Sequence, residues 1–210
     1  MKYITTLILL LFLYNTKAQL PIIEANITFN EKNSSVPFQV LKKNSYEFAI
    51  SYYIYSGGWK MNNDTYYTIL AYKKNAWKKL LLIYNEDSKS IKKTKKKQIN
   101  NRNAKRLISD LNKNNFWSLS LDSLNIKQLP PKILAKNEVI NDTVFIKTNV
   151  IRSFNVADGT TYYFEIFQNG KVKILSCESP ESYKNVFPEI QTTQNFINSK
   201  KAFVDFIESN

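Results

Sequence analysis

Histidine is absent from the 210 residues of this chain, and cysteine occurs once, at Cys177. Without histidine the chain lacks the commonest general base near neutral pH, and catalytic sites of the Ser-His-Asp or Cys-His type are excluded. Zinc sites built from histidine or paired cysteines are excluded too. A single cysteine cannot form an internal disulfide, so the fold must depend on its hydrophobic core. We therefore expect neither a metal nor another cofactor.

Arginine and glycine are also scarce. Only Arg102, Arg106 and Arg152 accompany the many lysines in a chain of net charge +13, and there are four glycines. Because recognition of phosphates and bases favours the bidentate guanidinium, this basic balance does not indicate nucleic acid. AT-rich coding explains much of the lysine content without a partner.

One lysine run is denser than the rest. It includes Lys89 and the candidate anion-binding residues Lys92, Lys93, Lys95, Lys96 and Lys97. No aromatic side chain is interleaved on which a base could stack, which again disfavours nucleic acid. We expect a mobile, solvated loop, with contact to acidic polysaccharide or an anionic surface as the alternative.

The start of the chain has the pattern of a secretory signal peptide. A short basic start precedes the apolar stretch 4–14, and Thr16-x-Ala18 supplies small residues before Gln19. The stretch is shorter than the roughly 20 apolar residues that span a bilayer. We expect a signal peptide over 1–18 and an exported, soluble mature chain with no transmembrane segment. No sorting domain is apparent after Ile207, so we expect a periplasmic rather than an extracellular location.

The mature chain predicts an α+β fold with an antiparallel sheet of aromatic-rich strands and two main helices. Strict period-two alternation predicts a strand over 46–55, and β-favouring residues predict strands over 66–72, 77–84, 144–147, 149–156, 162–168 and 172–177. The strands 66–72 and 77–84 should form a hairpin around Lys73-Lys74-Asn75-Ala76, with Tyr72 close to Trp77. Residues 118–141 are less regular, and Pro180 and Pro188 should bracket a loop. Helical spacing of apolar residues predicts helices over 101–113 and 193–208. We expect a single domain over 19–210, and a subdivision near 118–141 stays open. Each half runs from strands to a helix, so an architecture of two similar strand-strand-strand-helix halves is an alternative that also stays open.

Two turn signals surround the aromatic strand 162–168. They are Asp158-Gly159 and Asn169-Gly170, both typical of two-residue hairpins. Counting from these turns predicts a three-stranded meander in which Glu165 faces Arg152 on one side and Ile174 on the other. We expect Arg152 and Glu165 to form a structural cross-strand ion pair. Cys177 should be a buried, inert thiol opposite Tyr162.

The second half of the chain contains a set of short motifs, namely Phe116-Trp117-x-Leu119, Asp158-Gly159-Thr160-Thr161, a strand carrying Glu165, Asn169-Gly170-Lys171 and Ser179-Pro180. These motifs resemble those of a family of small uncharacterised exported proteins of Bacteroidota-type bacteria. This chain has Tyr162-Tyr163 where that family usually begins the strand with Trp, and Val172-Lys173 where an aromatic-His pair often follows. The resemblance implies bacterial export and carries over no catalytic residue.

The remaining candidates are aromatic and acidic side chains. Tyr53, Tyr55 and Trp59 are candidate ligand contacts, with core packing as the alternative. A hydrolase without histidine would need facing carboxylates, for which the candidates are Asp142, Asp158, Glu165, Glu178 and Glu181. We expect a non-enzymatic binding or envelope-associated protein. A carbohydrate- or polyanion-binding module and a carboxylate hydrolase are the alternatives, and the partner would be a polysaccharide, an anionic envelope surface or another envelope protein.

Overall fold

The computed structural model describes residues 20–24, 35–56, 63–124, 132–140, 143–151 and 159–210, with 132–140 and 143–151 described by their backbone alone. The helices are α2 (Val36–Lys43), α3 (Asn101–Lys113), the 3-10 turn η1 (Phe116–Ser118), α4 (Leu121–Leu124), α5 (Pro180–Val186) and α6 (Gln191–Ser209). The strands are β1 (Phe48–Ser56), β2 (Asp64–Lys73), β3 (Ala76–Asn85), β4 (Ser90–Ile99), β5 (Lys132–Ile140), β6 (Thr143–Ile151), β7 (Thr160–Gln168) and β8 (Lys171–Glu178).

Six strands form one antiparallel sheet in the order β4-β3-β2-β1-β7-β8, and β5 pairs with β6 in a separate ribbon. The α+β fold with an antiparallel, aromatic-rich sheet is therefore confirmed. The central strand β1 pairs with β2 on one side and with β7, more than 100 positions later in the chain, on the other. The two halves of the chain thus share one sheet.

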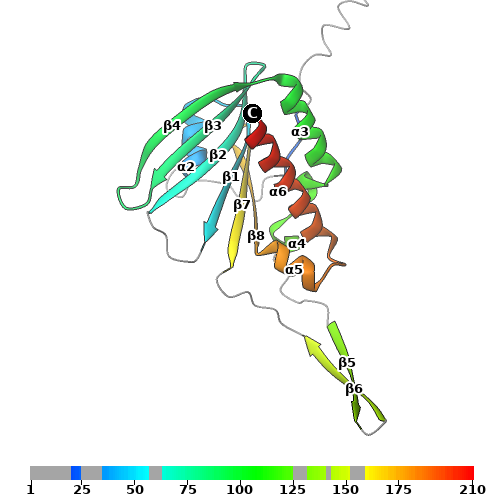
Figure 1. The fold of residues 1–210 in the computed structure, drawn as a ribbon. Coiled ribbons are helices and arrows are strands. Elements are labelled where there is room, and N and C mark those ends of the chain that lie inside the picture. The colour runs from blue at the N-terminus through cyan, green and yellow to red at the C-terminus, as the bar shows by residue number, and fades with distance from the viewer. Residues whose placement is uncertain (1–19, 25–34, 57–62, 125–131, 141–142, 152–158) are drawn as a thin grey trace, which may run out of the picture.

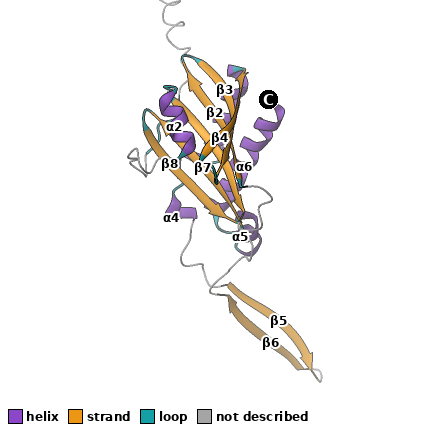
Figure 2. Ribbon diagram, turned by 90° about the vertical axis from the view of Figure 1, so that its left-hand side faces the viewer, coloured by secondary structure: helices purple, strands orange, loops and turns teal. Residues whose placement is uncertain are grey.

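Helices cover both faces of this sheet. Helices α3 and α6 lie on one face (Figure 1), and α2 lies on the opposite face (Figure 2). On the α3–α6 side, Phe48, Trp77, Phe164, Phe196 and Phe203 are among the buried core residues. On the α2 side, Phe38 and Leu41 pack with residues of the sheet. None of the helices in the described ranges is both long and apolar enough to cross a membrane.

Local sequence explains the hairpin between β2 and β3. Lys74 and Asn75 both have positive φ, at 49° and 61°, as the two central residues of a type I′ turn require. The turn sets the register, which places Tyr72 opposite Trp77 with their ring centroids 5.0 Å apart. The predicted hairpin is confirmed, and so is the helix over 101–113, where Asn100 caps α3 by accepting a hydrogen bond from the Arg102 amide.

The lysine run does not form the predicted loop. It forms β4, which pairs with β3 from Asn85↔Ser90 to Trp77↔Ile99 with one irregularity at Ile83/Tyr84. Because β4 is an edge strand, its lysine side chains reach water from both faces of the sheet, so strand formation buries no charge. Lysines on an edge strand also discourage pairing with another chain.

The predicted three-stranded meander is wrong on one flank. Strand β7 pairs with β1, so Ser51 occupies the position opposite Glu165 that we had predicted for Arg152. Arg152 itself lies outside the described residues, as does Asp158. A turn signal fixes where the chain reverses but not which strand then pairs, and β1 offers an apolar partner for both faces of β7. The other flank is confirmed, with Glu165 opposite Ile174 and Gln168 opposite Lys171.

Two further stretches differ from expectation. Residues 180–186, which we expected in a loop between Pro180 and Pro188, form helix α5, because proline is compatible with the first turn of a helix. Part of the irregular stretch 118–141 forms strand β5. Helix α2 was not predicted at all, although Ser35 caps it by accepting a hydrogen bond from the Phe38 amide at 3.3 Å.

Candidate functional site

The structure separates the predicted lysine and aromatic candidates. The candidate lysines lie on β4, whereas Tyr53 and Tyr55 lie on β1, with β3 and β2 in between. Trp59 lies outside the described residues. The lysines and the tyrosines of β1 therefore cannot be treated as one site.

Strand alternation divides the lysines of β4 between the two faces of the sheet. Ile99 pairs with Trp77, and both belong to the core beneath α3 and α6. Two residues before Ile99 in β4, Lys97 pairs with Lys79. The Lys79 Nζ donates to the Ile207 carbonyl of α6 at 2.6 Å, so Lys79 and Lys97 face the same helices. Alternation then places Lys95 and Lys93 on this face and Lys96 on the other.

Lysine and apolar side chains meet on the part of this face that lies beyond the helices. Lys95 pairs with Leu81, which pairs with Thr68, and Lys93 pairs with Ile83, which pairs with Tyr66. Ile54 of β1 lies on the same face. We call the following set the lysine-edged face: Ile54, Tyr66, Thr68, Leu81, Ile83, Lys93, Lys95 and Lys97. Its apolar side chains are only partly covered, and Ile54 and Tyr66 are 49% and 51% exposed.

Sequence reasoning did not find this face. Period-two alternation alone could have placed Tyr66 and Tyr72 on one side of their strand. The link to the lysines could not be made, because it depends on recognising the lysine run as a strand and on its register with β3.

The charges of the lysine-edged face are unbalanced. Within the part of the chain that the structure describes, no hydrogen bond or ion pair reaches Lys93, Lys95 or Lys97. Lys79 lies directly opposite Lys97, and burial, followed by repulsion from Lys97, lowers the pKa of the Lys79 ammonium. The face therefore presents several cations whose mutual repulsion an external anion would relieve.

Lys92 differs from its neighbours. Its Nζ lies 2.8 Å from Asp64 Oδ1, and hydrogen bonds from Lys92 and Asn85 lower the pKa of the Asp64 carboxyl. Lys92 falls at the irregularity between β3 and β4. It serves as a partner of Asp64 rather than as a free cation.

Tyr53 lies on the α2 side of the sheet. Its ring stacks on that of Tyr163 with centroids 4.7 Å apart and planes 4° from parallel, and the Tyr67 ring lies 4.9 Å away on the next strand. Burial raises the pKa of the Tyr53 phenol. These contacts favour the packing interpretation for Tyr53, whereas Tyr55 is half exposed at the end of β1.

Glu165 is a buried carboxyl group on the same side as Tyr53. It is 5% exposed, and burial raises its pKa to about 7, against the lowering effect of a hydrogen bond from Ser35. The Ser35 hydroxyl donates to Glu165 Oε2 at 2.5 Å. The Ser51 hydroxyl, opposite Glu165 on β1, is buried and has no hydrogen-bond partner among the described residues. A raised pKa suits an acid catalyst, but this carboxyl is closed to a substrate.

The other carboxylate candidates do not gather around Glu165. Glu178 is exposed at the end of β8, and Glu181 pairs with Lys200. Asp142 lies outside the described residues. In the ranges that the structure describes, no group of three or more His, Cys, Asp or Glu side chains is arranged to hold a metal ion.

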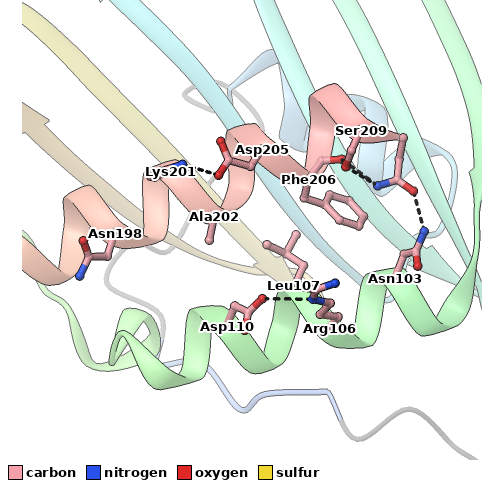
Figure 3. A pocket seen from close by; sticks show the side chains of 11 residues that line it. Asn103, Arg106, Leu107, Asp110, Asn198, Lys201, Ala202, Asp205, Phe206 and Ser209 are labelled. Carbon is pink, nitrogen blue, oxygen red and sulfur yellow. Dashed lines mark hydrogen bonds and ion pairs between the residues drawn. The ribbon is translucent and has the colours of Figure 1, made fainter.

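A cleft of about 660 Å³ lies between α3 and α6 (Figure 3). Leu107 and Phe206 contribute apolar surface to it. Its charged side chains are paired, Arg106 with Asp110 at 4.0 Å and Lys201 with Asp205 at 2.6 Å. The cleft has balanced charge, in contrast to the lysine-edged face.

No known protein family, curated protein or solved structure matches this chain.

Proposed function

We propose that this chain is an exported, non-enzymatic protein of a bacterial envelope that binds an anionic partner through the lysine-edged face. The observation that carries this proposal is the column formed by Lys93, Lys95 and Lys97, exposed on one face and unpaired among the described residues. Export rests on the signal-peptide pattern of residues 1–18, and a periplasmic location is part of the same proposal.

The geometry of an extended strand makes this column suitable for an anionic surface or polymer. Alternate residues of a strand lie roughly 6.8 Å apart, so the three ammonium groups can contact successive anionic groups. Each lysine close to an anionic surface contributes about 1 kcal/mol at physiological ionic strength. Because the attraction is electrostatic and the lysines are exposed, binding should weaken steeply as salt is added.

Binding to a soluble probe tests the proposal. We would titrate the protein with heparin, as an anionic polysaccharide, and with neutral dextran. The alternation of β3 and β4 supplies two variants of equal charge change, Lys95→Gln/Lys97→Gln on the lysine-edged face and Lys78→Gln/Lys96→Gln on the opposite face. We expect the first variant to raise the Kd for heparin roughly tenfold or more, since two contacts are lost, and the second to raise it by less than about threefold.

Equal losses in the two variants would mean that net charge alone attracts heparin, and the assignment to this face would be wrong. Absence of heparin binding to the unmodified protein at low salt would overturn the anionic partner as well.

A further inference from the structure

Exposed apolar side chains gather at one end of the sheet. Among the described residues, the exposed large apolar side chains are Ile22, Ile54, Tyr55, Tyr66 and Ile91. All except Ile22 lie where β1 ends and where β2 and β4 begin, and antiparallel pairing brings these strand ends together. Large exposed apolar groups that cluster mark an interaction surface more often than isolated ones do.

On the lysine-edged face, the apolar groups form a strip beside the lysine column. The row Tyr66–Ile83–Lys93 crosses three strands from an aromatic ring to an ammonium group, and the row Thr68–Leu81–Lys95 runs next to it. With neighbouring strands roughly 4.8 Å apart, the apolar side chains on β3, β2 and β1 lie about 5, 10 and 14 Å from the lysine column. A soluble polyanion would engage the lysines alone and would leave Ile54 and Tyr66 in water.

We propose that the occupant of the lysine-edged face is an anionic lipid layer, an inference that rests on the proposed function and specifies its partner. Lys93, Lys95 and Lys97 contact the anionic headgroups, while Ile54 and Tyr66 enter the boundary between headgroups and acyl chains. An anionic lipid layer offers negative headgroups to the lysine column and acyl chains to the apolar strip. Tyrosine suits this boundary because its ring is apolar and its hydroxyl stays hydrated.

The acidic groups nearby indicate how the face would dock. Asp64 is paired with Lys92, Glu86 accepts a hydrogen bond from Thr65, and Asp87 accepts from Asn63. Asp64 is the first residue of β2, and Glu86 and Asp87 lie in the turn after β3. All three carboxylates are outside the two rows described above. If the plane of the lysine-edged face lies parallel to the lipid surface, these carboxylates stay at the margin of the contact. If the protein docked through the turn after β3, they would lie against the headgroups.

Partition onto vesicles tests the inference. The probes are vesicles of phosphatidylcholine with phosphatidylglycerol and vesicles of phosphatidylcholine alone, with heparin binding measured in parallel. The test variant is Ile54→Ser/Tyr66→Ser. The matched control, Tyr55→Ser/Ile91→Ser, removes one isoleucine and one tyrosine from the same end of the sheet, but on its opposite face.

We expect the unmodified protein to bind the anionic vesicles only. Ile54→Ser/Tyr66→Ser should lower vesicle partition roughly tenfold and leave heparin binding unchanged, because the variant loses only the favourable free energy of burying apolar side chains in the lipid layer. Lys95→Gln/Lys97→Gln should lower both, and the control variant should lower neither. Melting curves would establish that each variant is folded.

Two results would overturn the inference. One is heparin binding without vesicle binding, which would leave the proposed function standing with a soluble polyanion as the partner. The other is vesicle partition that is insensitive to Ile54→Ser/Tyr66→Ser. If Lys95→Gln/Lys97→Gln kept both heparin binding and vesicle partition at the level of the unmodified protein, the proposed function itself would be contradicted.

Discussion

At the scale of single residues, Glu165 makes the stability of the protein depend on pH. Its folded-state pKa of about 7 lies above the ordinary value of 4.5, so the folded chain retains a proton that the unfolded chain loses between these two pH values. The free energy of unfolding should therefore be highest below pH 4.5, fall as the pH rises to 7, and level off above. Protonation is compatible with the surroundings, because the neighbouring Ser51 hydroxyl lacks a partner among the described residues.

We predict that Glu165→Gln removes this dependence and stabilises the protein at pH 8 by up to about 3 kcal/mol. Urea unfolding at pH 5 and pH 8 measures the effect. Glu178→Gln, which changes an exposed carboxylate on β8, is the control and should leave the pH dependence intact. If the unmodified protein instead became more stable between pH 5 and pH 7, the environment assigned to Glu165 would be wrong.

Cys177 gives a second prediction at this scale. The structure confirms that it is buried, at 2% exposure, and that it lies opposite Tyr162. Burial is the first cause that raises the pKa of its thiol to about 12. Because the thiolate is the reactive form, we expect a thiol reagent to label Cys177 slowly in the native protein and rapidly in urea. Rapid labelling of the native protein would indicate an accessible thiol.

At the scale of elements, Lys79 connects the sheet to the end of α6. Its bond to the Ile207 carbonyl satisfies one of the last carbonyls of the helix, which have no partner within the helix itself. We predict that Lys79→Met frays the last turn of α6 and lowers the free energy of unfolding by about 1 kcal/mol. Hydrogen exchange near residues 205–209 measures the fraying.

Lys78→Met is the control for this prediction, because Lys78 pairs with Gln98 on the opposite face of β3. It should leave exchange in α6 unchanged. Equal fraying in both variants would assign the effect to the loss of a positive charge from β3 rather than to the hydrogen bond between Lys79 and Ile207.

At the scale of the whole molecule, the two halves of the chain share one sheet and one core. The core beneath α3 and α6 includes Phe48 and Trp77 from the first half and Phe164, Phe196 and Phe203 from the second. We predict that a fragment of residues 19–124 shows no cooperative thermal transition, because β1 would lose β7 and the core would lose four phenylalanines, Phe164, Phe196, Phe203 and Phe206. Circular-dichroism melting of the fragment beside a chain of residues 19–210 measures this.

A cooperative transition in the fragment would instead support an independent first half, and with it the alternative of two similar strand-strand-strand-helix halves. In the full structure, the first half contributes four strands to the sheet before α3, and the second contributes two before α5 and α6. Apart from α2, which precedes β1, the order from strands to helices is common to both halves, but the number of strands in the shared sheet is not.

The sequence alone determined the features that depend on neighbours along the chain. Period-two alternation identified β1, turn signals beside β-favouring residues identified β7 and β8, and helical spacing identified α3 and α6. The short turn around Lys74-Asn75 set the register of β2 and β3. The burial of Cys177 also followed, because it depends on its own strand and on one hairpin.

Only the tertiary structure decided which distant strands meet. The pairing of β7 with β1 placed Ser51 opposite Glu165, and the position of β4 at an edge made a strand of a lysine run that lacks any strand-like pattern of its own. Pairing between distant strands is set by the apolar faces that must be buried together, and no local pattern records it. The lysine-edged face arises from four neighbouring strands, β1 to β4, so the sequence supplied its residues and the tertiary fold alone brought them together.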